Sequence, residues 1–127
     1  MLFRSRSPDE IKSWFQEEYD FFDPFLMKDM DLAVGRIHRA LDGFEKIAVY
    51  GDYDADGVTS TAMLYSYLES CGANVMYYIP EREGEGYGLN VAAIDVLKGK
   101  QVKLIITVDN GISSVEEVEY ALSLIHI

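Results

Sequence analysis

The sequence predicts an α/β protein whose doubly wound, mostly parallel, Rossmann-like sheet is incomplete and is preceded by a short helical N-terminal segment. Three short runs of β-branched, aromatic and other apolar residues begin about 28 and 29 residues apart, and each is typical of a buried parallel strand. Helix-like segments separate the runs, which is the order of consecutive βαβ units. Three parallel strands leave two unpaired edges, so the pattern indicates part of a larger domain.

The helical N-terminal segment is expected to cover residues 1–44. Pro8 lies at the first helical position of a capping box and begins a short helix. Apolar residues over 30–41 recur at helical spacing and predict a second helix that Gly43 ends. The aromatic stretch between them, residues 19–25, is expected to be a loop packed against the next segment of the chain.

The βαβ units are expected over residues 45–122. We expect strands at 47–50, 75–79 and 104–108, and helices at 58–69 and 90–98, the latter with Asn90 as its N-cap. A last helix should run from Ser114 to about Leu122, with Glu117 completing a capping box.

Composition and charge exclude several classes of protein. The 127 residues make one domain at most, and 49% hydrophobic residues are enough for a core. With 22 acidic and 11 basic residues the net charge is −11, the opposite of the basic surface on a free-standing nucleic-acid-binding protein. The single Cys71, the lack of a signal-like segment and the lack of a membrane-length apolar run predict a soluble protein in a reducing cytoplasm.

Four aspartates at the ends of the first and third strands are the most informative residues. Asp52, Asp54 and Asp56 alternate directly after the first strand, and Asp109 follows the third, at the edge where α/β folds build their sites. Two carboxylates about 4 Å apart repel by roughly 4 kcal/mol at an effective dielectric of 20, so a bound cation is the simplest compensation. If Asp54 and Asp56 keep strand-like geometry, they point the same way about 6 to 7 Å apart and can bind different members of a metal pair that Asp109 bridges.

Helix capping is the main alternative for any one of these aspartates, and Asp56 could cap a helix that begins near Val58. Three alternating acids with a fourth at the equivalent strand end favour a metal site over capping.

The same acids match the first half of an EF-hand calcium loop. Met63 stands at the twelfth position, which needs a bidentate glutamate, and a strand precedes the loop, so an EF-hand is excluded.

Two other sites with aspartates at strand ends stay open at this point. A haloacid-dehalogenase-type phosphatase has an Asp-x-Asp-Gly-Thr pattern with a nucleophilic aspartate, and Asp54-Ala-Asp-Gly comes close, although Val58 replaces the threonine. A receiver-like metal-binding regulatory module also gathers aspartates there, and its lysine from a later strand would lie beyond this chain.

Several separated motifs together resemble the RecJ branch of the DHH phosphoesterases. They are Asp23-Pro-Phe-Leu-Met-Lys-Asp-Met30, Tyr50-Gly-Asp-Tyr-Asp-Ala-Asp-Gly-Val-Thr-Ser-Thr61, Ile79-Pro-Glu-Arg82, Gly86-Tyr-Gly-Leu-Asn90 and Thr107-Val-Asp-Asn-Gly-Ile112. The resemblance covers roughly residues 20–121. It implies a DHH-type fold and a two-metal phosphodiesterase of DNA repair and recombination, an exonuclease that degrades single-stranded DNA from its 5′ end. Two divalent cations are implied, with Mn²⁺ expected and Mg²⁺ as the alternative.

The same resemblance implies roles for particular residues. Asp54 and Asp56 are the implied metal ligands of the first motif, Asp109 is the implied bridging ligand of the second, and Asp52 is a weaker candidate. Hard carboxylate oxygens favour Mg²⁺ or Mn²⁺, which would activate water and offset charge on the attacked phosphate. Arg82, in a glycine-rich loop at the same edge, is the candidate phosphate contact.

The chain also departs from the family pattern, since it has no Asp-His-His tripeptide. We assign no metal to His38, on a predicted helix, or to His126, within an end at 123–127 that does not resemble the family and that we expect to be non-native. Residues 1–127 are therefore expected to be a partial DHH domain that binds metal poorly, is inactive alone, and leaves most contacts with single-stranded DNA to missing regions.

A phosphodiesterase acting on short oligonucleotides or cyclic dinucleotides is the alternative within the family. The sequence predicts no membrane contact and leaves protein partners unknown.

Overall fold

The computed structural model describes residues 8–13, 21–81 and 88–125. Its elements, in chain order, are α1 (Pro8–Ser13), the 3-10 helix η1 (Pro24–Leu26), α2 (Met30–Asp42), β1 (Ile47–Tyr50), α3 (Ala55–Ser70), β2 (Val75–Tyr78), α4 (Val91–Gly99), β3 (Leu104–Thr107) and α5 (Val115–Leu124). The chain divides into two compact units, Met1–Asp31 and Leu32–Ile127, and the sheet belongs to the second. Within the described ranges no helix has the length and apolar character needed to span a membrane.

The sheet is parallel and three-stranded, in the order β2-β1-β3, which confirms the predicted strands. β1 lies between the other two and pairs with both along its whole length. Its last residue, Tyr50, lies opposite Tyr78 of β2 and Thr107 of β3. The three strands therefore end in one row, and the segments that come after them leave from one edge of the sheet, called here the carboxyl edge.

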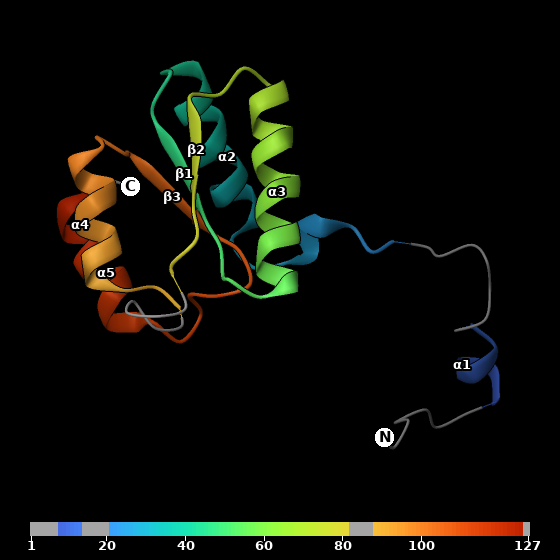
Figure 1. Ribbon diagram of the computed structural model, residues 1–127. Coiled ribbons are helices and arrows are strands. Elements are labelled where there is room, and N and C mark those ends of the chain that lie inside the picture. The colour runs from blue at the N-terminus through green and yellow to red at the C-terminus, as the bar shows by residue number, and fades with distance from the viewer. Residues whose placement is uncertain (1–7, 14–20, 82–87, 126–127) are drawn as a thin grey trace. The chain divides into compact units, whose positions relative to one another are not determined.

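Helices cover both faces of the sheet, as a doubly wound fold requires (Figure 1). α2 and α3 pack against Ile47 and Val49 on one face, and α4 and α5 pack against Ala48 and Tyr50 on the other. Successive residues of β1 thus serve opposite cores, and all four are fully buried. The two outer strands are only partly buried, and Tyr77 of β2 is 59% exposed, because each of them has a neighbouring strand on one side only.

The site is positioned by a change in the direction of the chain at the carboxyl edge. β1 and β3 are neighbours, but α3, which follows β1, and α5, which follows β3, lie on opposite faces of the sheet (Figure 1). Connections that diverge in this way leave a crevice, which is where open α/β sheets usually bind their ligands. The aspartates predicted to form a site lie in these two connections.

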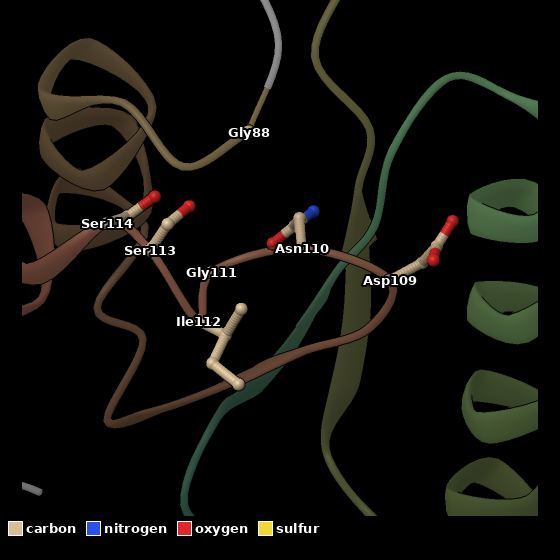
Figure 2. Close-up of a pocket in the computed structure, with 7 residues that line it drawn as sticks. All are labelled: Gly88, Asp109, Asn110, Gly111, Ile112, Ser113 and Ser114. Atoms are coloured by element: carbon tan, nitrogen blue, oxygen red, sulfur yellow. The ribbon is translucent and has the colours of Figure 1, made fainter.

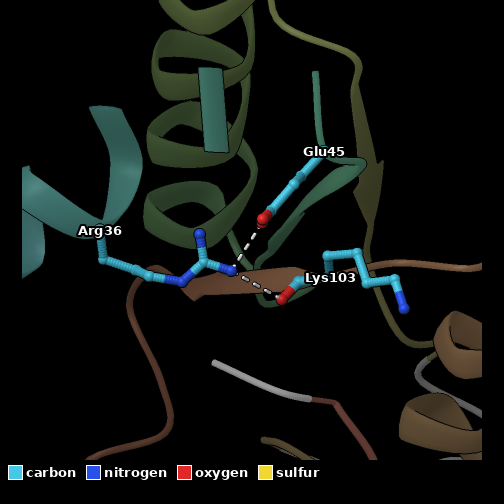
Figure 3. A network of polar contacts seen from close by, with 3 residues as sticks. All are labelled: Arg36, Glu45 and Lys103. Carbon is cyan, nitrogen blue, oxygen red and sulfur yellow. Dashed lines mark hydrogen bonds and ion pairs between the residues drawn. The ribbon is translucent and has the colours of Figure 1, made fainter. Parts of the chain in front are cut away.

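Arg36 joins α2 to the opposite edge of the sheet. Its Nη2 donates to Oε2 of Glu45 at 2.7 Å and to the carbonyl oxygen of Lys103 at 3.2 Å (Figure 3). Glu45 leads into β1 and Lys103 directly precedes β3. The guanidinium group therefore fixes the helix relative to the starts of two neighbouring strands.

The start of α5 differs from the prediction. Ser114 is the N-cap residue, but its side chain makes no capping hydrogen bond, so the expected capping box with Glu117 is not formed. The backbone ψ of Ser114 is 59°, outside the extended conformation that aims an N-cap side chain at the first turn. At the other end, α5 continues to Leu124 and the following Ile125 is buried.

The aromatic stretch before α2 forms a short turn in its described part, residues 21–25. Phe21 and Phe22 are 94% and 90% exposed. The backbone turns into η1 at this point, and the side chain of Asp23 caps it by accepting the N–H of Phe25 at 2.9 Å. Because proline begins this turn and an aspartate caps it, the turn forms through local bonds and does not need the aromatic rings to be enclosed.

Candidate functional site

The connection after β1 lies in close contact with the first turn of α3, the helix that follows it. A Cβ atom at Gly57 would lie 2.5 Å from the carbonyl oxygen of Asp52 and 2.7 Å from its Cβ, so only glycine fits this point of the first turn of α3. Asp52 is fully buried there. Its Oδ1 accepts the N–H of Tyr53 at 2.6 Å, and its Oδ2 is buried with no hydrogen-bond partner within the described ranges. Asp52 therefore does not reach the surface of the carboxyl edge.

Asp54 and Asp56 do not have the strand-like geometry that we expected of them. Asp54 is the N-cap of α3, and its Oδ1 accepts the N–H of Gly57 at 2.8 Å. α3 consequently begins at Ala55, three residues before the predicted start at Val58, and Asp56 lies in its first turn. The capping role that we considered for Asp56 belongs to Asp54, because an aspartate in extended backbone conformation satisfies an otherwise unpaired N–H of the helix. Both aspartates are exposed.

Asp109 leaves the end of β3 in an unusual backbone conformation. The sheet pairing extends one residue beyond β3, where the N–H of Val108 donates to the carbonyl oxygen of Tyr50 at 2.9 Å. Asp109 then takes a φ of 59° and Gly111 a φ of 93°. A left-handed aspartate at a strand end is uncommon and indicates a locally constrained loop. In Figure 2 the Asp109 side chain points toward α3, the helix whose start carries Asp54 and Asp56.

The electrostatics of Asp109 show that the aspartates lie close together. Its pKa is raised above the ordinary value of 3.8, first by loss of hydration and next by the negative charges of Asp54 and Asp56. A hydrogen bond with the Asp54 carboxyl group and the charge of Asp52 raise the pKa of Asp109 further. The structure thus brings together the acids that follow β1 and the acid that follows β3, as expected for parallel strands that end at one edge.

The donor set suits a hard divalent cation, but these residues do not form a closed site. Carboxylate oxygens are the ligands that Mg²⁺ and Mn²⁺ prefer, and mutual repulsion among the acids is what a cation would relieve. Among the described residues, however, no three His, Cys, Asp or Glu side chains are arranged to hold a metal ion. Asp54, Asp56 and Asp109 therefore fit as part of a metal site that needs further ligands.

The other residues considered in the sequence analysis do not lie in this cluster or are outside the described part of the chain. Arg82, the candidate phosphate contact, and His126 lie outside the described residues. His38 is exposed on α2, which packs against the same face of the sheet as α3.

Two polar groups at this edge were not expected from the sequence. The hydroxyl of Tyr50, at the end of β1, donates to the carbonyl oxygen of Gly88 at 2.9 Å and accepts from Nδ2 of Asn90 at 3.3 Å. Asn110 follows Asp109, and both polar atoms of its side chain are buried with no hydrogen-bond partner in the described part of the chain. The Asp-Asn-Gly sequence at a strand end could have predicted that Asn110 lies at the site. Tyr50 could not be told from a core residue, because its sequence neighbours are apolar.

Comparison with known proteins places this arrangement in a family. Residues 46–127 match the model of the DHH family, N-terminal domain. The chain belongs to the DHH family. This membership sets aside the dehalogenase-type and receiver-like alternatives, which belong to other families.

Individual relatives of this DHH-family chain are single-stranded-DNA-specific exonucleases. The RecJ exonuclease of Bacillus subtilis (strain 168) is 49% identical over 108 residues, which cover 85% of this chain and 14% of that protein. The RecJ exonuclease of Escherichia coli (strain K12) is 41% identical over 99 residues, or 77% of this chain and 17% of that protein. This chain therefore spans less than a fifth of the length of these two relatives.

A solved structure supports the fold directly. The crystal structure of exonuclease RecJ bound to manganese superposes with a TM-score of 0.70 at 37% identity, over 76% of this chain and 25% of that one. The α/β fold with its parallel sheet is thus the fold of the DHH family, and a three-stranded sheet is consistent with a part of that longer structure.

Proposed function

We propose that this chain provides part of the metal site of a metal-dependent exonuclease that degrades single-stranded DNA from its 5′ end. The observation that carries the proposal is the meeting of Asp54, Asp56 and Asp109 after the ends of β1 and β3, where the first two raise the pKa of the third. The names of the relatives support the substrate, and the length of those relatives makes the activity a property of a larger protein.

In this proposal Asp54 and Asp56 would be ligands to two divalent cations, Asp109 would be a ligand that both share, and the buried Asp52 is a weaker ligand candidate. Mn²⁺ is the proposed metal, with Mg²⁺ as the alternative, and the manganese in the similar solved structure supports this choice. When bound, such ions generate a nucleophilic hydroxide from water and neutralise charge on the phosphate. The aspartates orient the ions, and their combined negative charge is balanced only when cations are present.

The DNA strand itself is held mainly by parts of the protein beyond these residues. A single strand needs a positive groove along its backbone, and the net charge of this chain, −11, has the opposite sign. Arg82 remains the proposed phosphate contact from this chain, since a guanidinium group binds phosphate through two parallel hydrogen bonds. A DNA-processing role also favours the cytoplasmic location that we predicted.

The alternative within the family is a phosphodiesterase acting on short oligonucleotides or cyclic dinucleotides. The relatives at 49% and 41% identity carry the exonuclease name, which favours a polymeric single strand as substrate. We therefore retain the exonuclease as the proposed function.

The experiment measures Mn²⁺-dependent release of nucleotides from 5′-labelled and 3′-labelled single-stranded DNA by the full-length protein that carries this segment. Replacing Asp109 with asparagine keeps the size of the side chain and removes the charge. Loss of an outer-shell group alone commonly costs about 10- to 100-fold at metal sites, so we expect Asp109→Asn to lower the rate by more than about 100-fold.

Glu119→Gln, an exposed position in the middle of α5, serves as the matched loss of one charge and should leave the rate unchanged. An Asp109→Asn protein with the wild-type rate would remove Asp109 from the site. Rapid hydrolysis of dinucleotides with none of the labelled strands would favour the alternative substrate.

A further inference from the structure

The residues that come after Asp109 line a hollow on the carboxyl edge. Together with Gly88 they enclose about 460 Å³, which is within the range of roughly 300 to 1,000 Å³ typical of small-ligand sites (Figure 2). Asp109 is part of its wall, so a group in the hollow adjoins the aspartate cluster. Figure 2 shows that the loop directs Asp109 toward α3 and continues in the other direction toward the hollow.

The polar groups that line the hollow are neutral apart from Asp109. They are the amide of Asn110 and the hydroxyl groups of Ser113 and Ser114. Figure 2 shows these three side chains on the side of the loop that faces Gly88, whereas Ile112 turns away. The described lining contains no cation and includes the acidic Asp109, so these residues favour neutral hydrogen-bonding groups over a phosphate.

The side chain of Asn110 is the strongest single indication of a ligand. Its Nδ2 and Oδ1 are both buried, and neither has a hydrogen-bond partner among the residues that the structure describes. Buried polar atoms of native proteins are almost always hydrogen-bonded, so an amide whose donor and acceptor are both unpaired calls for a bonding group from outside. The hydroxyl of Ser114 also makes no capping hydrogen bond to α5.

Both walls of the hollow are held in place by the surrounding structure. On one side, the Tyr50 hydroxyl donates to the carbonyl oxygen of Gly88. On the other, the left-handed turns at Asp109 and Gly111 fix the loop, and a Cβ atom at Gly111 would lie 2.9 Å from Oγ1 of Thr107. A binding site benefits from such preorganisation, because its groups are then ordered before the ligand arrives.

We propose that this hollow binds the nucleoside portion of the nucleotide whose phosphate lies at the aspartate cluster, and that Asn110 is the residue that hydrogen-bonds to it. The proposal rests on the proposed function, since that function places the phosphate. An asparagine amide presents a donor and an acceptor side by side and pairs with the edge of a base, and serine hydroxyls bind either kind of partner. The phosphate and the nucleoside then occupy opposite sides of Asp109.

The experiment follows the side-chain amide signal of Asn110 in the ¹⁵N-labelled chain by NMR, without metal, during titration with thymidine and, separately, with inorganic phosphate. We expect thymidine to shift this signal and the backbone signals of Ser113 and Ser114, and phosphate to leave them in place. Loss of one neutral hydrogen bond weakens binding by about 2- to 12-fold, so Ser113→Ala should weaken thymidine binding by about threefold and Asn110→Ala by about tenfold. Asn74→Ala, at the other edge of the sheet, is the matched control and should change nothing.

Unmoved Asn110 signals at the solubility limit of thymidine, or equal shifts with phosphate alone, would overturn the proposal. If Asn110→Ala fails to fold, the wild-type titration and the exposed Ser113→Ala variant still decide the question. Two readouts separate the two proposals: nucleotide release by the full-length protein without a thymidine response of Asn110 removes the nucleoside site and leaves the nuclease, whereas a thymidine response with a wild-type release rate in the full-length Asp109→Asn protein removes Asp109 from the metal site.

Discussion

Oδ1 of Asp54 accepts the backbone N–H of Gly57 at 2.8 Å, so one carboxylate both caps α3 and faces the acid at the end of β3. The positive end of the helix is one partner for this negative charge, and in the proposed site a divalent cation would be a second. The cap orients the Asp54 carboxylate before any metal binds. Stability and metal binding can therefore be separated at this residue.

Asp54→Asn should preserve the fold and weaken metal binding. Asparagine caps a helix about as well as aspartate, so the free energy of unfolding should change by less than about 0.5 kcal/mol, whereas Asp54→Ala should lose about 1 kcal/mol. Thermal unfolding measures the first quantity, and Mn²⁺-induced stabilisation measures the second. Equal Mn²⁺ stabilisation of wild-type and Asp54→Asn proteins would show that Asp54 is a cap and not a ligand.

Gly57→Ala should destabilise the chain even though alanine is the better helix former by about 1 kcal/mol. The new Cβ atom would lie 2.5 to 2.7 Å from backbone atoms of Asp52, which cannot move as a flexible side chain would. Overpacking of this kind costs about 1–3 kcal/mol, measured by chemical denaturation. Gly99→Ala, in the last turn of α4 with nothing within 4 Å of its Cβ position, is the matched control and should be neutral or stabilising. Similar effects of the two substitutions would refute the close approach.

Arg36→Met should lower the free energy of unfolding by about 1 kcal/mol, because it keeps the apolar stem and removes the donor to Glu45 and to the Lys103 carbonyl. Denaturant titration in low and high salt checks this value. Arg39→Met, exposed on the same helix, should stay within about 0.5 kcal/mol of the wild type. A loss at Arg39 as large as that at Arg36 would mean that the helix, and not the bonded network, is affected.

Asp109→Asn should stabilise the metal-free chain at neutral pH. The pKa of Asp109 is raised in the folded state, so its ionised form disfavours folding, and this penalty is complete only above the raised pKa. As the pH falls through that value and below 3.8, both states bind the proton and the advantage of asparagine should disappear. Unfolding temperatures of the two proteins across this pH range test the sign, with Glu119→Gln as the charge control. An advantage that grew on acidification would contradict the convergence of the acids.

The parallel strands were predictable because periodicity and spacing are properties of the chain itself. β1 coincides with the predicted 47–50, and Asn90 caps α4 as expected. Local competition decided the features that were missed. Asp54 and Asp56 lie in alternation in the sequence, but a helix cap interrupts the strand-like geometry between them. At the amino edge, Phe44 and Gln101 take left-handed conformations close in sequence to glycines that would adopt them more easily, which residue type alone does not reveal.

The most direct test of the central claim is where Mn²⁺ binds on this chain. Substoichiometric Mn²⁺ broadens the NMR signals of nearby nuclei, and weak binding is enough for the measurement. We predict that the amide signals of Asp54, Asp56 and Asp109 disappear first, while those of Lys46 and Lys103 at the opposite edge of the sheet persist. Broadening centred elsewhere, such as on Glu116 and Glu117 at the start of α5, or spread evenly over the acidic surface, would contradict a metal site between β1 and β3.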